Sequence, residues 1–193
     1  CALPISELNL IWDHLLPGFK EEPLAEDPET QVALQEKLGT LALPPPEPGP
    51  APSLQDSIDG RTYQFDPGDN NFVATCSFSF TDSSCVYTVT DTAETEHHIT
   101  LGRGEWIEGE TMIPGPNLVP FYKANADILL PAKIASAFSW KGMDTLALTV
   151  RYIESPHSTY YTFAFDGEKV TLQRSASMGL FRGVPAMEGR QVR

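Results

Sequence analysis

The stretch TLALTVRYIESPHSTYYTFAFDGEKVTLQ, residues 145–173, decides the fold of this chain. Apolar residues occupy alternate positions in three successive segments, 146–152, 161–165 and 170–172. This is the period of a β-strand that buries one face. Between the last two segments, Asp166-Gly167 offers a tight turn, because glycine adopts positive φ without steric cost. The stretch therefore predicts an antiparallel meander of three strands.

The same alternation extends upstream of the meander to about residue 58. Further strands are predicted at residues 61–65, 72–80, 85–91, 96–102, 105–113 and 133–140. About nine strands with turn signals between them are typical of closed or stacked antiparallel sheets. We predict a mainly β fold, in which residues 58–193 form an antiparallel β-barrel-like (lipocalin-like) or sandwich domain of about nine strands.

Residues 1–57 form a helical and proline-rich arm or linker. Leu8, Ile11, Trp12 and Leu15 recur at helical spacing before Pro17-Gly18 ends the helix. A helix of this length is marginal alone, so we expect its apolar side to dock on another surface. A second short helix follows Pro28. Residues 43–52 are rich in proline and predict an extended segment, for which a role as ligand of a proline-recognition module is the alternative.

The composition of the chain excludes several kinds of partner. The net charge is −13 and the pI is about 4.6, so the clustered cations that bind nucleic acid are missing. The same acidity disfavours an anionic membrane surface, and no apolar run approaches the length of a membrane span. Hydrophobic residues make up 41% of the chain, which is enough for a packed core. The compartment, cytoplasmic or exported, stays open.

Several phrases of the sequence resemble one known module. These phrases are IWDHLLPGF, LALPPP, IDGRTYQF, EWIEGETMI, KIASAFSW and the meander itself, and together they cover nearly the whole chain. The module is the segment after the catalytic domain in bacterial serine hydrolases related to class C β-lactamases and penicillin-binding proteins. The resemblance implies that the first helix is similar to the last helix of that catalytic domain. It also implies a partner, a serine-hydrolase catalytic domain in the same parent chain.

The catalytic motifs of that family are not in this sequence. Acylation there needs a serine followed three residues later by lysine, a Tyr-x-Asn element and a Lys-Thr-Gly strand. Ser139-Trp140-Lys141 misses the first spacing by one residue, and no Lys-Thr-Gly or Gly-x-Ser-x-Gly occurs. No catalytic residue and no cofactor is therefore predicted for this chain, and any chemistry belongs to the parent hydrolase.

Two polar constellations remain as candidate sites. Glu94, Glu96 and His98 share one face of a predicted strand and offer carboxylate and imidazole ligands to a divalent metal, although a solvated face is the simpler interpretation. Glu108 and Glu110 near Trp106 suggest a glycosidase pair, but both point to one side of a single strand. The aromatic residues Trp106, Trp140, Tyr152 and Phe163 are expected in the barrel core rather than on a sugar-binding platform.

The cysteines form no disulfide framework and no zinc motif. Cys76 and Cys85 lie on adjacent predicted strands, so a bridge between them is geometrically conceivable, and two small buried thiols are the simpler expectation.

Three hypotheses about function follow from these observations. The first is a non-catalytic accessory domain that stabilises a serine-hydrolase domain or shapes access to its active site. The alternative is a lipocalin-like barrel that encloses a small molecule, for which a tightly filled interior would count against the idea. The third is a metal-dependent enzyme that uses Glu94, Glu96 and His98.

Overall fold

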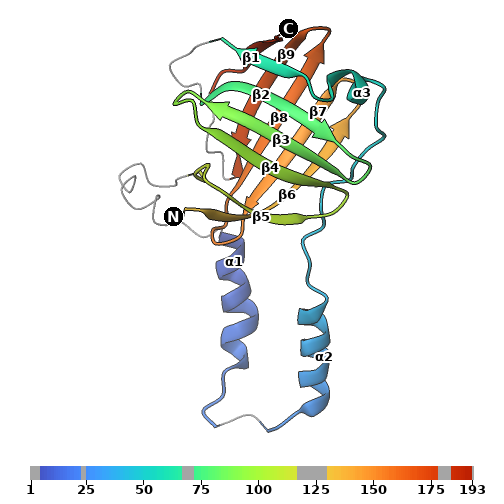
Figure 1. The fold of residues 1–193 in the computed structure, drawn as a ribbon. Helices are drawn as coiled ribbons and strands as arrows, with labels where there is room; N and C mark the ends of the chain where they lie inside the picture. Colours follow the sequence, from blue (N-terminus) through green and yellow to red (C-terminus); the bar gives the residue numbers. More distant parts are fainter. Residues whose placement is uncertain (1–4, 23–24, 67–71, 117–129, 178–183, 193) are drawn as a thin grey trace. The chain divides into compact units, whose positions relative to one another are not determined.

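A computed structural model describes residues 5–22, 25–66, 72–116, 130–177 and 184–192 of the chain (Figure 1). The stretch between the predicted strands 105–113 and 133–140 lies largely outside these ranges. The chain divides into two compact units, Cys1–Leu43 and Pro44–Arg193. We call the first unit the arm and the second the barrel unit.

The arm contains the two predicted helices. The first consists of α1 (Ile5–Leu10), a π-helical turn η1 (Ile11–Leu15) and a 3-10 turn η2 (Leu16–Gly18). It ends at Pro17-Gly18 as predicted. The second helix, α2 (Pro28–Gly39), is capped at its N-terminus by Asp27, whose carboxylate accepts the Thr30 N–H at 3.0 Å. None of the residues of η1, η2 and α2 is buried.

The proline-rich segment belongs to the barrel unit, because it is bound to the barrel wall. The Pro48 carbonyl accepts the Trp140 N–H at 2.8 Å, and the Arg103 guanidinium donates to the Gly49 carbonyl at 3.4 Å. Gly49 has φ +67°, and a Cβ there would collide with the Trp140 carbonyl oxygen. The short helix α3 (Leu54–Ile58) follows, and its Ile58 is buried in the core.

The described strands form one sheet that closes on itself (Figure 1). They are β1 (Thr62–Phe65), β2 (Val73–Phe80), β3 (Ser84–Asp91), β4 (Glu96–Arg103), β5 (Ile107–Thr111), β6 (Ala132–Lys141), β7 (Thr145–Tyr152), β8 (Ser158–Asp166), β9 (Lys169–Ala176) and β10 (Met187–Gln191). Their order is β4-β3-β2-β1-β10-β9-β8-β7-β6-β5, with antiparallel neighbours throughout, and a parallel pairing of β4 with β6 closes the ring. β5 lies beside β6 at the seam.

The fold is therefore mainly β, and a closed barrel rather than a sandwich. The nine predicted strands, including the meander β7–β9, are confirmed. The sequence pattern does not predict β10, because Met187–Gln191 has no alternating apolar residues. This strand completes the ring between β1 and β9. Its buried residue is Gly189, where a Cβ would lie 2.9 Å from the Phe65 ring, so the strand is packed through a residue without a side chain.

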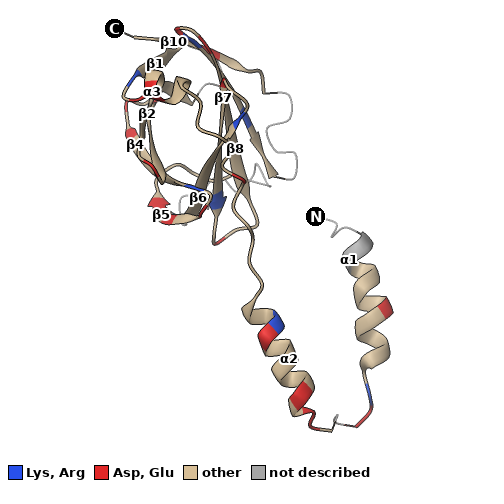
Figure 2. Cartoon of the chain, turned by 90° about the vertical axis from the view of Figure 1, so that its right-hand side faces the viewer, with Lys and Arg blue, Asp and Glu red and all other residues tan. Residues whose placement is uncertain are grey.

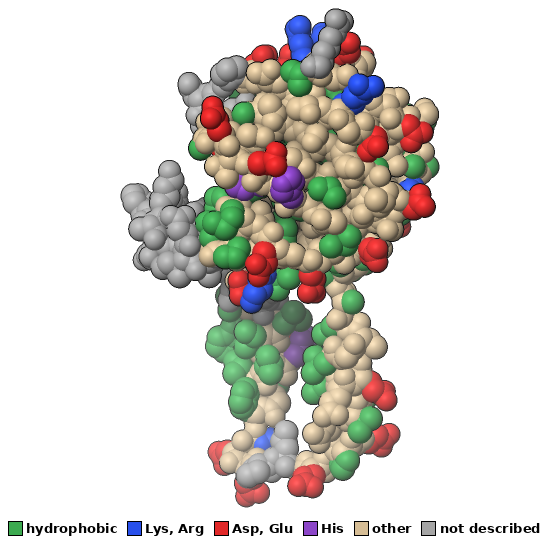
Figure 3. Space-filling view, in the orientation of Figure 1, with side chains coloured by type: hydrophobic (Ala, Val, Ile, Leu, Met, Phe, Trp, Pro, Cys, Tyr) green, Lys and Arg blue, Asp and Glu red, His purple; other side chains and the backbone are tan. Residues whose placement is uncertain are grey.

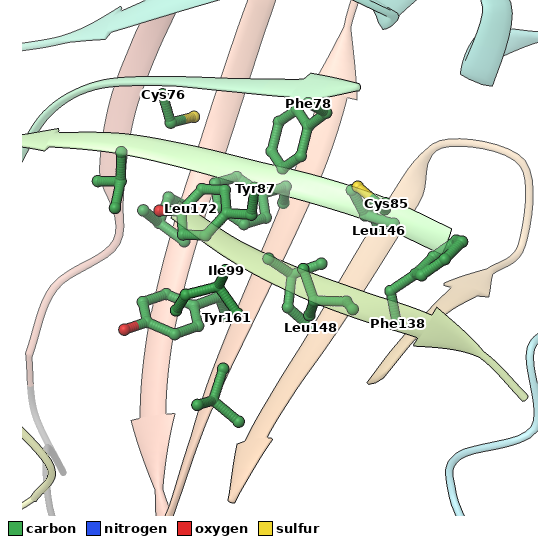
Figure 4. Packing of buried hydrophobic residues seen from close by; sticks show 14 of the residues in the cluster. Cys76, Phe78, Cys85, Tyr87, Ile99, Phe138, Leu146, Leu148, Tyr161 and Leu172 are labelled. Atoms are coloured by element: carbon green, nitrogen blue, oxygen red, sulfur yellow. The ribbon is translucent and has the colours of Figure 1, made fainter. Parts of the chain in front are cut away.

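Aromatic side chains fill the middle of the barrel (Figure 4). β2 and β8 lie on opposite sides of the ring, and the rings of Phe78 and Phe163 meet with centroids 4.9 Å apart. Tyr87 of β3 lies 5.6 Å from both of these rings. All three residues are 0% exposed. The central layer of the barrel is therefore a packed core.

Both described cysteines are buried free thiols. Cys76 of β2 pairs with Val89 of β3, and Cys85 of β3 pairs with Phe80 of β2. Along the strands, the two cysteines are therefore separated by the distance from residue 76 to residue 80. At about 3.4 Å per residue this separation is roughly 14 Å, far beyond disulfide reach. Burial raises the pKa of both thiols. The simpler expectation, two small buried thiols, is confirmed.

Candidate functional site

The predicted metal ligands do not converge on one point. Glu96 and His98 lie on the outer face of β4, where the Glu96 Oε1 is 3.0 Å from the His98 Nε2. Glu94 lies in the preceding turn with φ +63° and is exposed. Within the described ranges, no group of three or more His, Cys, Asp or Glu residues is placed to hold a metal ion. The pair remains a two-ligand contact on a solvated surface.

A chain of hydroxyl, imidazole and carboxylate runs through this pair. The Thr88 Oγ1 is 3.0 Å from the His98 Nδ1, and the Glu96 carboxylate contacts the other ring nitrogen, Nε2. A nucleophilic hydroxyl also needs an oxyanion hole of free N–H donors. Thr88 lies in the middle of β3, whose backbone pairs with β2 on one side and β4 on the other. The backbone groups of β3 around Thr88 are therefore engaged in the sheet.

The neighbouring His97 is buried, and its side chain contacts Asp91. Its Nε2 lies 3.1 Å from the Asp91 Oδ2, and the other oxygen of Asp91 accepts the N–H groups of Ala93 and Thr95. These hydrogen bonds, that of His97 first, hold the pKa of Asp91 below its usual value. These hydrogen bonds of Asp91 stabilise the turn between β3 and β4.

Three of the four predicted core aromatic residues are in the core. Trp140, Tyr152 and Phe163 are buried, as expected. Trp106 is only half-buried and lies on the outside of the barrel, where the Arg151 guanidinium is 5.2 Å from its ring. Glu108 and Glu110 are exposed on the one strand β5, so no opposed pair of carboxylates forms there.

The sequence analysis does not single out Arg174, a charged residue on the inner face of the barrel. Arg174 of β9 follows Val170 and Leu172 on the inward face, and it is paired across the ladder with Tyr161 of β8. Its guanidinium lies 5.8 Å from the ring of Tyr161 and 5.8 Å from that of Phe72. The Tyr161 ring is 5.8 Å from Tyr87 in turn. The sequence does contain a signal for this orientation, because residue 174 continues the alternation of the inward-facing residues 170 and 172.

The Tyr87 hydroxyl is an unsatisfied buried group. No hydrogen-bond partner for it exists among the described residues. Burial raises the pKa of Tyr87 well above its usual value, while the charge of Arg174 acts in the opposite direction. The phenol is therefore a neutral donor at physiological pH.

The arm presents an apolar surface (Figure 3). Its exposed large apolar side chains are Leu8, Leu10, Ile11, Trp12, Leu15, Leu16, Phe19, Val32, Leu34, Leu38, Leu41 and Leu43. Trp12 is 65% and Phe19 73% exposed. A hollow of about 380 Å³ is lined by Leu15 and Phe19 together with His14, Gly18, Lys20 and Glu22. None of the described helices is both long and apolar enough to span a membrane.

Charge is distributed unevenly over the arm. Acidic residues are scattered over the barrel unit and α2, whereas the first helix carries little charge (Figure 2). The first helix is thus the least polar surface of the arm, and an apolar partner surface suits it better than water does.

Comparison with known proteins finds a likeness in fold alone. Neither models of known protein families nor curated proteins match the sequence. Among solved structures, the wild-type fluorescent protein UnaG has a TM-score of 0.45 and 9% identity, covering 72% of this chain and 99% of its own. The fatty-acid-binding protein of Manduca sexta has a TM-score of 0.42 and 11% identity, covering 70% and 99%. At these identities the likeness concerns the barrel fold and not function.

Proposed function

We propose that this chain is a non-catalytic accessory module that docks, through its arm, on the catalytic domain of a serine hydrolase related to class C β-lactamases. Docking would stabilise that domain or shape access to its active site. The observation that carries the proposal is the exposure of every large apolar side chain described in the arm from Leu8 to Leu43. The resemblance of the sequence to the segment that follows such catalytic domains suggests the partner.

The energetics of the arm favour a docked state. Two helices of about a dozen residues each are marginal in water unless an apolar face is buried. Burying a large apolar side chain contributes about 1.5–3 kcal/mol. Covering the five residues Leu8, Ile11, Trp12, Leu15 and Phe19 would therefore supply on the order of 10 kcal/mol before the cost of association. This is enough to order the arm against a partner.

The barrel fits a supporting role. Its central layer is packed with aromatic rings, and the sequence lacks the serine-lysine, tyrosine-asparagine and lysine-threonine-glycine elements of the family. Two observations test the proposal. The purified chain should not turn over a chromogenic β-lactam or a p-nitrophenyl ester, and the sequence encoded directly before Cys1 should contain a Ser-x-x-Lys motif. Clear turnover, or an unrelated upstream sequence, would refute it.

A second candidate function is the binding of a small molecule by the barrel. The position of Arg174 on the inward face favours it, together with the Tyr87 hydroxyl, which has no hydrogen-bond partner within the described ranges. The packed layer of Phe78 and Phe163 would confine such a ligand to the Arg174 end. Calorimetric titration with decanol and decanoate tests this candidate, since a barrel that binds no small molecule gives no heat with either.

A further inference from the structure

We propose that a hollow on the outer face of the barrel binds a small zwitterion whose carboxylate and ammonium stand at opposite ends of a short apolar chain, as in an ω-amino acid. The hollow has a volume of about 240 Å³ and lies over β8, β9 and β10. Its outward-facing side chains include Ala164, Asp166, Lys169, Thr171, Glu188 and Arg190. The proposal goes beyond the proposed function, and it involves neither the arm nor the interior of the barrel.

The hollow forms because two short side chains stand among longer ones. Ala164 of β8 pairs with Thr171 of β9, which pairs in turn with Glu188 of β10. All three side chains are exposed, and residues directly opposite each other on one face of a sheet are neighbours. Ala164 and Thr171 therefore form the floor of the hollow, and the charged side chains around them form its walls.

The positive end of the hollow is a pair of opposed cations. Lys169 of β9 pairs directly with Arg190 of β10, and both side chains are exposed. Neither side chain takes part in the ion pairs found within the described ranges. Like charges directly opposite each other on a sheet destabilise it. A carboxylate between Lys169 and Arg190 would relieve this repulsion and accept hydrogen bonds from both.

The negative end of the hollow is Glu188. It shares the outer face of β10 with Arg190, two residues away, and this spacing is about 7 Å along a strand. Asp66 also lines the hollow, and its N–H donates to the Glu188 carbonyl at 3.1 Å. Its carboxyl group adds negative charge beside that of Glu188. A ligand ammonium is attracted to this end and donates to the Glu188 carboxylate.

The two ends together determine the chemistry of the ligand. A ligand that satisfies both carries opposite charges about 7 Å apart, a separation that an extended 6-aminohexanoate provides. Its methylene chain then lies over Ala164 and Thr171. A molecule with charge of one sign gains attraction at one end and meets repulsion at the other, so the hollow favours the zwitterion.

Asp166 is the group that competes with a ligand carboxylate. It pairs with Lys169 across the β8–β9 hairpin and also lines the hollow. One carboxylate faces two cations in this row, so the row keeps a net positive charge. Removing the charge of Asp166 should therefore strengthen binding of the ligand, whereas removing a charge from Arg190 or Glu188 should weaken it.

The test is titration of the full chain with 6-aminohexanoate, followed in ¹H–¹⁵N spectra at constant ionic strength. We expect the amide signals of Thr171, Gly189 and Arg190 to shift in a saturable way. Solvent screens these exposed charges, so weak binding, in the millimolar range, is expected. Hexanoate and hexylamine, which each carry one of the two charges, should bind several-fold more weakly. So should 4-aminobutanoate, whose shorter chain cannot reach both ends.

Three variants then test the assigned contacts. Arg190→Gln and Glu188→Gln should each weaken 6-aminohexanoate binding about 3- to 10-fold, and Asp166→Asn should tighten it. The matched controls are Lys141→Gln and Glu110→Gln, which neutralise exposed side chains on β6 and β5 and should bind as the wild type does. All five substitutions are at exposed side chains, and the wild-type spectra need no variant.

Two results would overturn the proposal. One is the absence of saturable shifts around the hollow, or shifts scattered over the surface. The other is equal binding of the zwitterion and the two singly charged compounds, with no change on Arg190→Gln or Glu188→Gln. Neither result bears on the docking of the arm or on binding inside the barrel.

Discussion

Phe78 on β2 and Phe163 on β8 meet edge to face across the barrel, with ring centroids 4.9 Å apart and an interplanar angle of 81°. Strands on opposite sides of a closed sheet thus touch through two side chains. The contact fills the space in which a larger barrel would enclose a ligand. The centre of the barrel therefore has a structural role, which leaves its end and its outer surfaces for binding.

The first prediction concerns this contact. Phe163→Ala should lower the free energy of unfolding by about 3–5 kcal/mol, because it leaves a cavity that rigid neighbouring rings cannot close. The measurement is urea denaturation followed by fluorescence. Met143→Ala, at a 66% exposed side chain, serves as control and should change the value by less than about 0.5 kcal/mol. A small loss for Phe163→Ala would show that the centre is loosely packed.

A second prediction concerns the Tyr87 hydroxyl. Tyr87→Phe should raise the free energy of unfolding of the ligand-free protein by about 1–3 kcal/mol, because it removes a buried polar group without a described partner. Tyr152→Phe is the comparison, since that hydroxyl donates to the Ile113 carbonyl at 3.4 Å and its loss should not stabilise. Destabilisation by Tyr87→Phe would mean that the hydroxyl already has a partner in the ligand-free protein.

A third prediction concerns the proline-rich segment. Gly49→Ala should destabilise the barrel unit, because the new Cβ meets the Trp140 carbonyl at a residue with φ +67°. We expect a cost of about 2 kcal/mol or more in urea denaturation, combining backbone strain with the clash. Gly142→Ala isolates the strain, since Gly142 has φ +80° and an added Cβ would meet nothing within 4 Å. This control should cost about 1 kcal/mol. Equal losses would show that the segment detaches readily from β6.

A fourth prediction concerns acid stability. The pKa of Asp91 is lowered in the folded state by its hydrogen bonds to His97 and Thr95. Its stabilising contribution is therefore complete above the unfolded pKa of about 3.9 and is lost as the pH falls through the lower folded value. In urea denaturation, the stability difference between wild type and Asp91→Asn should shrink as the pH falls from about 5 to about 2.

The control for that experiment is Asp82→Asn, in the exposed turn between β2 and β3. Its difference from wild type should vary less with pH than that of Asp91→Asn. Parallel pH profiles for all three proteins would contradict the assigned role of Asp91.

Much of the fold is predictable because one face of nearly every strand is apolar. The alternation of Leu146, Leu148 and Val150 determines both the strand and its buried face. The pattern misses β10 because its buried position is Gly189, which has no side chain to contribute. It also misses the binding of Pro48 and Gly49 to the barrel wall, because that binding depends on two backbone carbonyls, which every residue has.

The candidate sites are harder to predict than the strands. The sequence places Glu96 and His98 correctly on one face, but whether a third ligand meets them depends on the turn that holds Glu94. Arg174 escapes prediction because a charged residue near the end of a strand usually faces water. Its surroundings come from Phe72 and Tyr161, which are brought together by closure of the barrel rather than by proximity in the sequence.

The docking proposal can be tested by calorimetric titration of this chain into the hydrolase domain that we expect to be encoded before Cys1. We expect saturable binding that Trp12→Glu with Leu15→Glu abolishes, because both side chains belong to the exposed apolar surface of the arm. Met143→Glu, at a similarly exposed side chain on the barrel, should bind as the wild type does. Equal binding by all three proteins, or none by the wild type, would contradict the proposal.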